Sequence, residues 1–145
     1  MLKFILTSIV SCISFWSFSQ TEIGWATLAD VKFTDKFSRE VDAYYYYPHF
    51  GASVRSLEGK EISIKGFMLV IDPENRIYVL SKNPFAECFF CGNAGPESII
   101  ELKLKDGHPK FKMDQIVTVK GRLRLNADDI YQCNYILEEA ELSKE

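Results

Sequence analysis

Beyond Gly59, hydrophobic and polar residues alternate with the period of two that is typical of β-strands. The turn Asp-Pro-Glu-Asn at residues 72–75 separates the first two runs of alternation and predicts a hairpin. A long polar and glycine-rich loop over residues 83–97 follows the second run. The pattern predicts five strands, over residues 62–71, 77–80, 98–105, 116–125 and 131–142.

Residues 20–58 form a lead-in with a different pattern. Apolar positions predict one strand over residues 25–33, which the polar residues 34–36 would end. The tyrosine run 44–47 predicts a second strand with both faces covered. Apolar residues at helical spacing predict one or two helical turns over residues 49–57, and Gly59 suits the end of that helix.

Two of the predicted strands share an internal Lys-Gly pair, at Lys65-Gly66 and Lys120-Gly121. A glycine inside a strand marks a bulge or a sharp bend, as a small barrel needs where it turns a corner. Bends in the first and fourth of five strands predict a small five-stranded antiparallel barrel, OB-like, over residues 59–142. The short helix and the lead-in strand would precede the barrel, and residues 143–145 would form a tail. A small β-sandwich is the alternative.

The N-terminus predicts a secretory signal. Lys3 is followed by an uncharged stretch, and Ser17-Phe18-Ser19 places small residues where a signal peptidase cuts. Residues 1–19 are therefore interpreted as a signal peptide, and the protein as exported to the periplasm without stable membrane insertion. The alternative is a lipoprotein that is cleaved before Cys12, with a lipid anchor on that residue.

Composition is that of a globular protein: of 145 residues, 47% are hydrophobic, 26% charged and 14% aromatic. The formal net charge is −3, and loss of residues 1–19, which carry Lys3 and no acid, makes it −4. Lys120, Arg122 and Arg124 share one predicted strand face, but a solvated face explains them better than a polyanion groove. An acidic exported chain is not expected to bind nucleic acid. No hydrolase or phosphate-loop motif is present.

The cysteine pair in the long loop carries the most chemical information. Cys88 and Cys91 stand two residues apart and are followed at once by Gly92, the pattern of a metal knuckle. Two thiolates at this spacing can hold one ion, and the glycine allows the chain to turn tightly around it. Tetrahedral zinc needs two further ligands.

Strand direction indicates which residues could supply those ligands. If each strand reverses the one before, the loop 83–97, the start of strand five with Cys133, and His49 before strand one lie at the same end of the barrel. His108 lies at the other end. The predicted zinc ligands are therefore Cys88, Cys91, Cys133 and His49, and copper(I) suits the same thiolates.

Two other interpretations of the cysteines remain open. In an exported protein Cys88 and Cys91 can form a disulfide that staples the loop, with Cys133 as a buried thiol. A catalytic dithiol is disfavoured, because the sequence Gly-Asn-Ala-Gly-Pro after Cys91 does not start a helix that would lower a thiol pKa.

The segment from Gly59 to Glu101 resembles a family of small uncharacterised exported proteins of Gram-negative bacteria. The likeness rests on the Lys-Gly strand, the Asp-Pro turn and, above all, the loop Asn-Pro-Phe-x-x-Cys-Phe-Phe-Cys-Gly-x-Ala-Gly-Pro-Glu-Ser, and it covers most of residues 45–142. The chain is also distantly similar to exported domains of unknown function whose loop carries a Cys and a His, where this sequence has a second Cys. The resemblance implies an OB-like barrel, a periplasmic setting and a link to metal through Cys88 and Cys91. It implies no activity.

Two hypotheses of function follow. The first is a periplasmic zinc-binding protein with a structural, storage or delivery role. The second is a non-enzymatic OB-like module that binds an unknown protein or small-molecule partner and whose cysteines form a structural disulfide. Replacement of Cys133 by serine weakens metal retention under the first hypothesis and is silent under the second.

Overall fold

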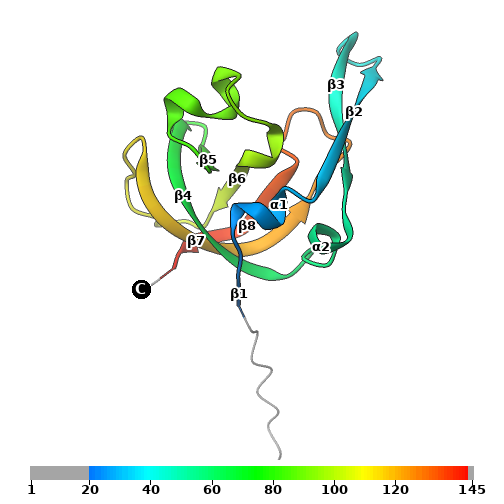
Figure 1. Cartoon of the computed structure of the whole chain (residues 1–145). Coiled ribbons are helices and arrows are strands. Elements are labelled where there is room, and N and C mark those ends of the chain that lie inside the picture. Colours follow the sequence, from blue (N-terminus) through cyan, green and yellow to red (C-terminus); the bar gives the residue numbers. More distant parts are fainter. Residues whose placement is uncertain (1–19, 144–145) are drawn as a thin grey trace, which may run out of the picture.

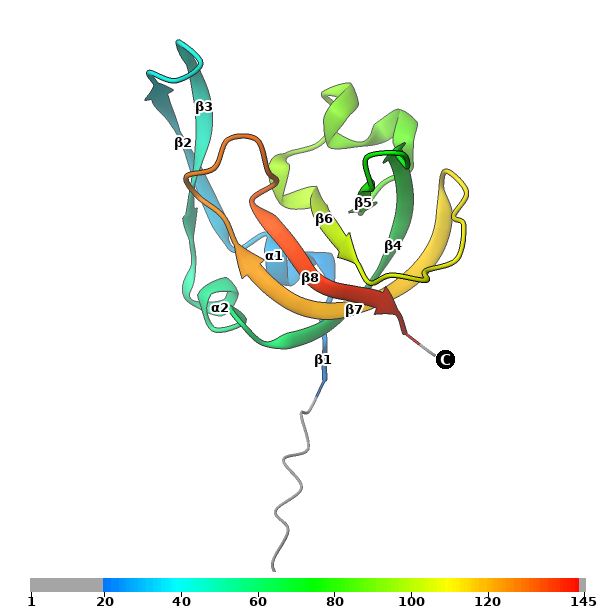
Figure 2. The ribbon, with the colours of Figure 1, turned by 180° about the vertical axis from the view of Figure 1, so that it is seen from behind.

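The computed structural model describes residues 20–143, so the predicted signal peptide and Cys12 lie outside the described residues. Five strands curl into a closed barrel (Figures 1 and 2). They are β4 (Glu61–Asp72), β5 (Ile77–Ser81), β6 (Ile99–Leu104), β7 (Gln115–Leu125) and β8 (Tyr135–Leu142).

The strands follow the order β4-β5-β6-β8-β7, and β7 pairs back with β4 to close the barrel. The predicted five-stranded barrel is confirmed. The expectation that every pairing is antiparallel is wrong, because β6 and β8 pair in parallel. Because β7 runs opposite to both β6 and β8, these two strands run in the same direction, and closure of the barrel makes them neighbours.

Both predicted glycine bends are present in the barrel. Directly after Gly66, at Phe67 and Met68, the pairing of β4 with β7 overlaps the start of its pairing with β5. A β-carbon at Gly66 would lie 2.6 Å from the Ser81 carbonyl oxygen, and one at Gly121 would lie 2.6 Å from that of Glu138. The β7–β8 register shifts between Lys120 and Arg122. Glycine is required at both positions because the neighbouring backbone leaves no room for a side chain.

The lead-in differs from its prediction in three places. It contains β1 (Thr21–Glu22), α1 (Trp25–Leu28), β2 (Val31–Ser38), β3 (Ala43–Phe50) and α2 (Ala52–Arg55). The predicted strand over residues 25–33 therefore begins as a helix, residues 34–36 continue β2 instead of ending it, and His49 lies in β3 instead of a helix. The tyrosine run is in a strand, but Tyr44 and Tyr46 are exposed.

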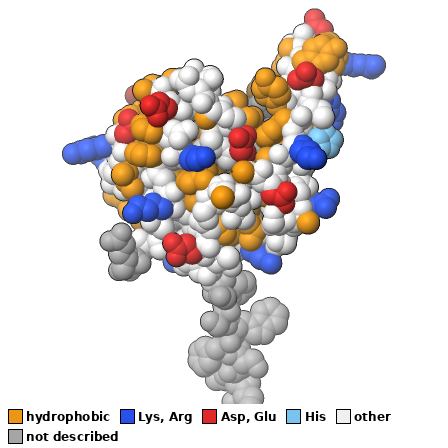
Figure 3. Space-filling view, viewed as in Figure 1, with side chains coloured by type: hydrophobic (Ala, Val, Ile, Leu, Met, Phe, Trp, Pro, Cys, Tyr) orange, Lys and Arg blue, Asp and Glu red, His pale blue; other side chains and the backbone are white. Residues whose placement is uncertain are grey.

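The physical reason is that β2 and β3 form a separate two-stranded ribbon. Residues 34–36 pair with Tyr45, Tyr46 and Tyr47. Because this part of the ribbon buries neither face in the barrel core, polar residues can continue the strand. The ribbon projects beyond the barrel and lies beside the loop 126–134 in both ribbon views (Figures 1 and 2). Hydrophobic side chains gather on its outer end, while charges of both signs are scattered over the rest of that face (Figure 3).

The lead-in is anchored on the barrel core at its base. Tyr135 on β8 is fully buried, and its hydroxyl donates a hydrogen bond to the Leu28 carbonyl at 2.7 Å. Phe50 packs against the same ring, with centroids 5.7 Å apart. The loop between β5 and β6 carries three short 3-10 helices, η1 (Phe85–Glu87), η2 (Phe89–Cys91) and η3 (Pro96–Ser98). Among the described residues, no helix has the length and apolar character to cross a membrane.

Candidate functional site

The loop of residues 82–98, here called the knuckle loop, turns tightly around Cys88. The Cys88 carbonyl accepts hydrogen bonds from the backbone N–H of Cys91 at 3.1 Å and of Asn93 at 3.4 Å. Gly92 takes the left-handed conformation, with φ of 75°. This is a backbone that favours glycine, so the tight turn predicted from the Cys-x-x-Cys-Gly pattern is present.

The two thiols of this loop lie in different environments. Cys88 is fully buried against Leu69, Val79 and Ile99, on the outer face of three barrel strands. Cys91 is exposed, and its thiol donates a hydrogen bond to the Phe85 carbonyl oxygen, with Sγ 3.2 Å from that oxygen. Partial desolvation, and then the adjacent Cys88 thiol, raise the pKa of Cys91. A thiol with a raised pKa is a poor nucleophile at neutral pH.

Cys133 lies in the loop between β7 and β8, because β8 begins at Tyr135 and not at the predicted residue 131. Its side chain is partly buried against the cluster that contains Cys88. Burial, followed by the charge of Glu101, raises the pKa of Cys133 to about 12. The structure therefore brings the two cysteine-bearing loops together on one side of the barrel.

The two histidines lie away from the thiol cluster. His49 Nε2 is 2.8 Å from the Thr34 hydroxyl, and its ring packs against Tyr47 on the ribbon. His108 packs against Tyr78 and Phe111 at the opposite end of the barrel from Cys133, as strand direction predicted. Across residues 20–143, no group of three or more His, Cys, Asp or Glu side chains is placed to hold a metal ion. The four-residue ligand set thus stays a prediction.

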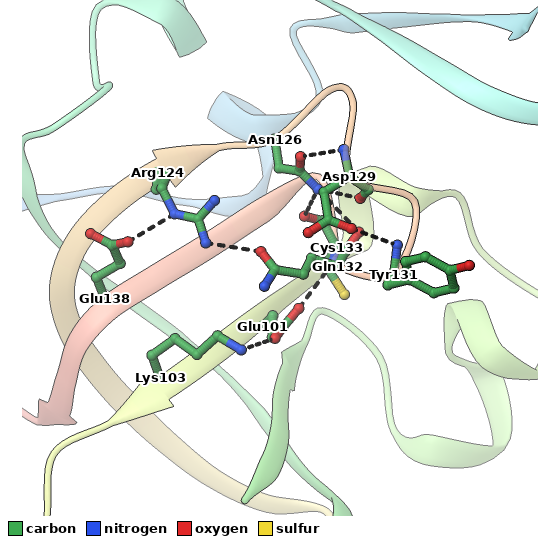
Figure 4. A network of polar contacts seen from close by, with 9 residues as sticks. All are labelled: Glu101, Lys103, Arg124, Asn126, Asp129, Tyr131, Gln132, Cys133 and Glu138. Carbon is green, nitrogen blue, oxygen red and sulfur yellow. Dashed lines mark hydrogen bonds and ion pairs between the residues drawn. The ribbon is translucent and has the colours of Figure 1, made fainter. Parts of the chain in front are cut away.

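A network of hydrogen bonds holds the loop 126–134 (Figure 4). Asn126 is buried at its centre, and its side-chain Nδ2 donates to the Asp129 carbonyl at 2.7 Å. The same amide also reaches the carbonyls of Gln132 and Cys133, at 3.3 and 3.2 Å. Its Oδ1 accepts the Asp129 N–H at 3.0 Å. One side chain therefore bonds three carbonyls and one N–H of the loop backbone.

The network continues onto the barrel strands (Figure 4). Glu101 on β6 accepts a hydrogen bond from the Cys133 N–H at 3.1 Å and forms an ion pair with Lys103. Arg124 on β7 donates to Gln132 at 2.9 Å and to Glu138 at 2.8 Å. These contacts fix the loop against the outer face of β6 and β8.

Between these loops lies a hollow of about 700 Å³, here called the outer groove. Its floor is the outer face of β5 and β6, with Val79 and Ile99. Its walls are the ribbon, the knuckle loop and the loop 126–134. Aromatic rings come from all three walls: Tyr45, Tyr46, Phe89, Phe90 and Tyr131.

The polar side chains of the outer groove are largely occupied within the protein. Both oxygens of Glu101 have partners, and Gln132 Oε1 accepts from Arg124. Asp129 Oδ1 accepts the Tyr131 N–H at 3.0 Å. The free surface that the groove presents is consequently mostly apolar.

The basic strand face of β7 is paired with acids on β8. Lys120 contacts Glu141 at 3.1 Å, while Arg122 and Arg124 contact Glu138 at 3.3 and 2.8 Å. This arrangement fits the predicted solvated strand face.

Sequence reasoning located the cysteine loop but missed the outer groove. The signal available was the concentration of aromatics in loops and in an exposed ribbon, where no core demands them. It could not show that these segments border one hollow.

Comparison with known proteins supports the fold. No family model and no curated protein matches the chain. A solved structure that is similar is that of a DUF3299 family protein from Pseudomonas aeruginosa PAO1, with a TM-score of 0.53 and 14% sequence identity. The match covers 88% of this chain and 98% of that chain. A likeness at this identity shows a shared architecture, and an uncharacterised small family is in keeping with it.

Proposed function

We propose that this protein is a non-enzymatic binding module that holds an apolar organic molecule in the outer groove. The observation that carries the proposal is the hollow of about 700 Å³, with rings on three walls and an apolar floor. Ligand sites are typically about 300–1,000 Å³, mostly apolar, and carry few polar groups. An exported, periplasmic setting, predicted from residues 1–19, is part of the proposal.

Exposure of the rings supports the same function. Tyr46, Phe90 and Tyr131 are 59%, 50% and 71% exposed, although each borders a concave surface. Large apolar groups that remain open to water in a hollow are a mark of binding sites. The loop that carries Tyr131 is fixed by hydrogen bonds, so this ring needs little ordering when a ligand binds.

The test is a fluorescence titration with N-phenyl-1-naphthylamine, a neutral apolar probe. We expect saturable binding to the purified protein with one probe per chain. Tyr46→Ala should weaken binding by about five- to thirtyfold, equivalent to about 1–2 kcal/mol of lost ring contact.

Tyr44→Ala is the matched control for Tyr46→Ala. Tyr44 lies on the same strand and is 72% exposed, but it does not border the groove. Its replacement should leave the probe affinity unchanged. Non-saturable binding, or equal effects of the two variants, would refute the proposed site.

A second proposed function is metal binding at the knuckle loop, most simply of zinc. The supporting observation is the close pair of thiols on a tight turn with Gly92 in the left-handed conformation. Cys133 packs against the same cluster as Cys88 and is the third thiol that the fold offers. If His49 keeps its contacts with Thr34 and Tyr47, the fourth position is open to water or to a partner. Copper(I) suits the same thiolates.

Elemental analysis with thiol titration tests the metal function. The protein, exported to a periplasm and purified without chelator, should carry about one zinc or copper per chain and lose it in Cys91→Ser. Cys133→Ser should retain less metal than the wild type. A metal-free protein with two oxidised cysteines and one free thiol would instead support the disulfide staple.

A further inference from the structure

We infer that the ligand of the outer groove is an organic cation, in which an apolar or aromatic body carries an ammonium-type charge. The inference rests on the proposed binding function and names the chemical class that the groove selects. It follows from the charges at the groove and from the kind of ring that surrounds it.

The charged side chains that border the groove are Glu101, Asp129 and Lys103. Glu101 and Lys103 form an ion pair, so their charges largely cancel. Asp129 accepts the Tyr131 N–H through Oδ1, and its charge has no basic partner among the ion pairs of the described residues. One negative charge therefore remains at the rim.

A second carboxylate adds to this negative region. The charge of Glu40, on the turn of the ribbon, together with desolvation and the charge of Asp129, raises the pKa of Tyr131. Arg124, which belongs to the loop network, is engaged by Glu138 and Gln132. The rim beside Tyr131 thus offers a favourable potential to a cation and an unfavourable one to an anion.

The rings provide the matching short-range interaction. The faces of tyrosine and phenylalanine rings carry partial negative charge and attract cations that approach within about 6 Å. Tyr46, Phe90 and Tyr131 come from three different walls of one hollow. An ammonium group placed among them would contact aromatic faces and lie near the Asp129 carboxylate. The ribbon already shows this preference, with Lys36 Nζ 4.1 Å from the Tyr47 ring centroid.

The test is a competition between two ligands of similar size and opposite charge. Benzyltrimethylammonium and phenylmethanesulfonate are each titrated against N-phenyl-1-naphthylamine bound to the purified protein. We expect the cation to compete at about tenfold lower concentration than the anion, and added salt to narrow the difference.

Asp129→Asn removes the charge while its amide oxygen can still accept the Tyr131 N–H, so the loop should keep its shape. This variant should reduce the preference for the cation by about three- to tenfold. Asp128→Asn is the control: it makes the same change in net charge on a neighbouring residue that does not border the groove, and its exposed ion pair with Lys36 contributes little. It should leave the preference unchanged.

The outcomes separate the two proposals. If the probe binds but both competitors displace it equally, or if Asp128→Asn acts like Asp129→Asn, the cation inference is refuted and the binding function stands. If the probe does not bind to the groove at all, the proposed function itself is refuted.

Discussion

The loop 126–134 and the knuckle loop border the same groove, but different forces hold them. Side-chain hydrogen bonds hold the first, chiefly those of the buried Asn126. The second is centred on the buried Cys88 and its backbone turns, and its side-chain hydrogen bonds are spread over several residues, such as Asn93 Nδ2 donating to the Ala86 carbonyl and Asp114 Oδ1 accepting the Phe85 N–H. Hydrogen bonds fix direction and leave little freedom, whereas apolar burial holds a segment in place without fixing every torsion.

The groove is therefore expected to be rigid on one side and adjustable on the other. Tyr131 is carried by the hydrogen-bonded loop, and Phe89 and Phe90 by the loop that is held through burial. We therefore expect the wall with Tyr131 to set ligand orientation and the knuckle wall to adapt to ligand size.

Asn126→Ala should have the largest effect. It removes the donor for three carbonyls and the acceptor for the Asp129 N–H, and it leaves those groups partly buried. We expect a loss of about 2–4 kcal/mol in the free energy of unfolding, measured with urea, and weaker probe binding.

Asn75→Ala serves as the matched control for Asn126→Ala. Asn75 is exposed on the β4–β5 turn and bonds only to Asp72 among its side-chain contacts. Its replacement should cost less than about 1 kcal/mol and leave binding unchanged. Equal losses in the two variants would show that the loop network has no special role.

Cys88→Ser tests the other wall of the groove. A hydroxyl in place of the fully buried thiol would lie among Leu69, Val79 and Ile99, so we expect a loss of about 1–3 kcal/mol in urea unfolding. In the metal-free protein, Cys91→Ser, at an exposed position of the same loop, should change the free energy of unfolding by no more than about 0.5 kcal/mol. A larger cost for Cys91→Ser would mean that its contact with Phe85, and not burial, holds this loop.

The pH dependence of the free energy of unfolding tests the raised pKa of the Cys133 thiol. Its folded pKa of about 12 is above that of an unfolded thiol, so the unfolded chain loses this proton first as pH rises. The stabilising contribution of the protonated thiol is full below about pH 8.5 and is lost toward pH 12, by up to about 1.4 kcal/mol per pH unit. Urea unfolding of the wild type and of Cys133→Ala between pH 8 and 10 measures it. Parallel curves for the two proteins would contradict the raised pKa.

The barrel could be predicted from the sequence because burial of one strand face imposes an alternation of hydrophobic and polar residues. Strands β4 to β8 each have an inward face, and the period of two records that face directly. Gly66 and Gly121 were informative for the same reason, since a close backbone approach excludes every other residue. The start of β8 was placed four residues early because Tyr131 and Cys133 resemble strand residues in isolation.

The site was harder to predict because its contacts join distant segments. Nothing local to Asn126 shows that its amide will bond four backbone groups of the loop, or that Glu101 will accept the Cys133 N–H from 32 residues away. The ribbon has no buried face of its own, so its strands can contain polar residues. The polar residues 34–36 therefore predict the end of a strand, although β2 continues through them. Strand direction predicted which loops share an end of the barrel, but not which side chains meet there.

The smallest predicted effect concerns the ribbon, the third wall of the groove. Lys36 forms an exposed ion pair with Asp128 at 3.4 Å and lies over the Tyr47 ring, and this pair links the ribbon to the loop 126–134. If the loop is held by its own hydrogen bonds, it does not depend on the ribbon. Lys36→Ala should then change stability by no more than about 1 kcal/mol, because exposed pairs contribute little, and should leave the Tyr131 wall intact. Urea unfolding measures the first point, and the cation preference in the competition assay measures the second. A large loss of either would show that the ribbon and the loop act as one wall, and that the loop network alone does not fix the groove.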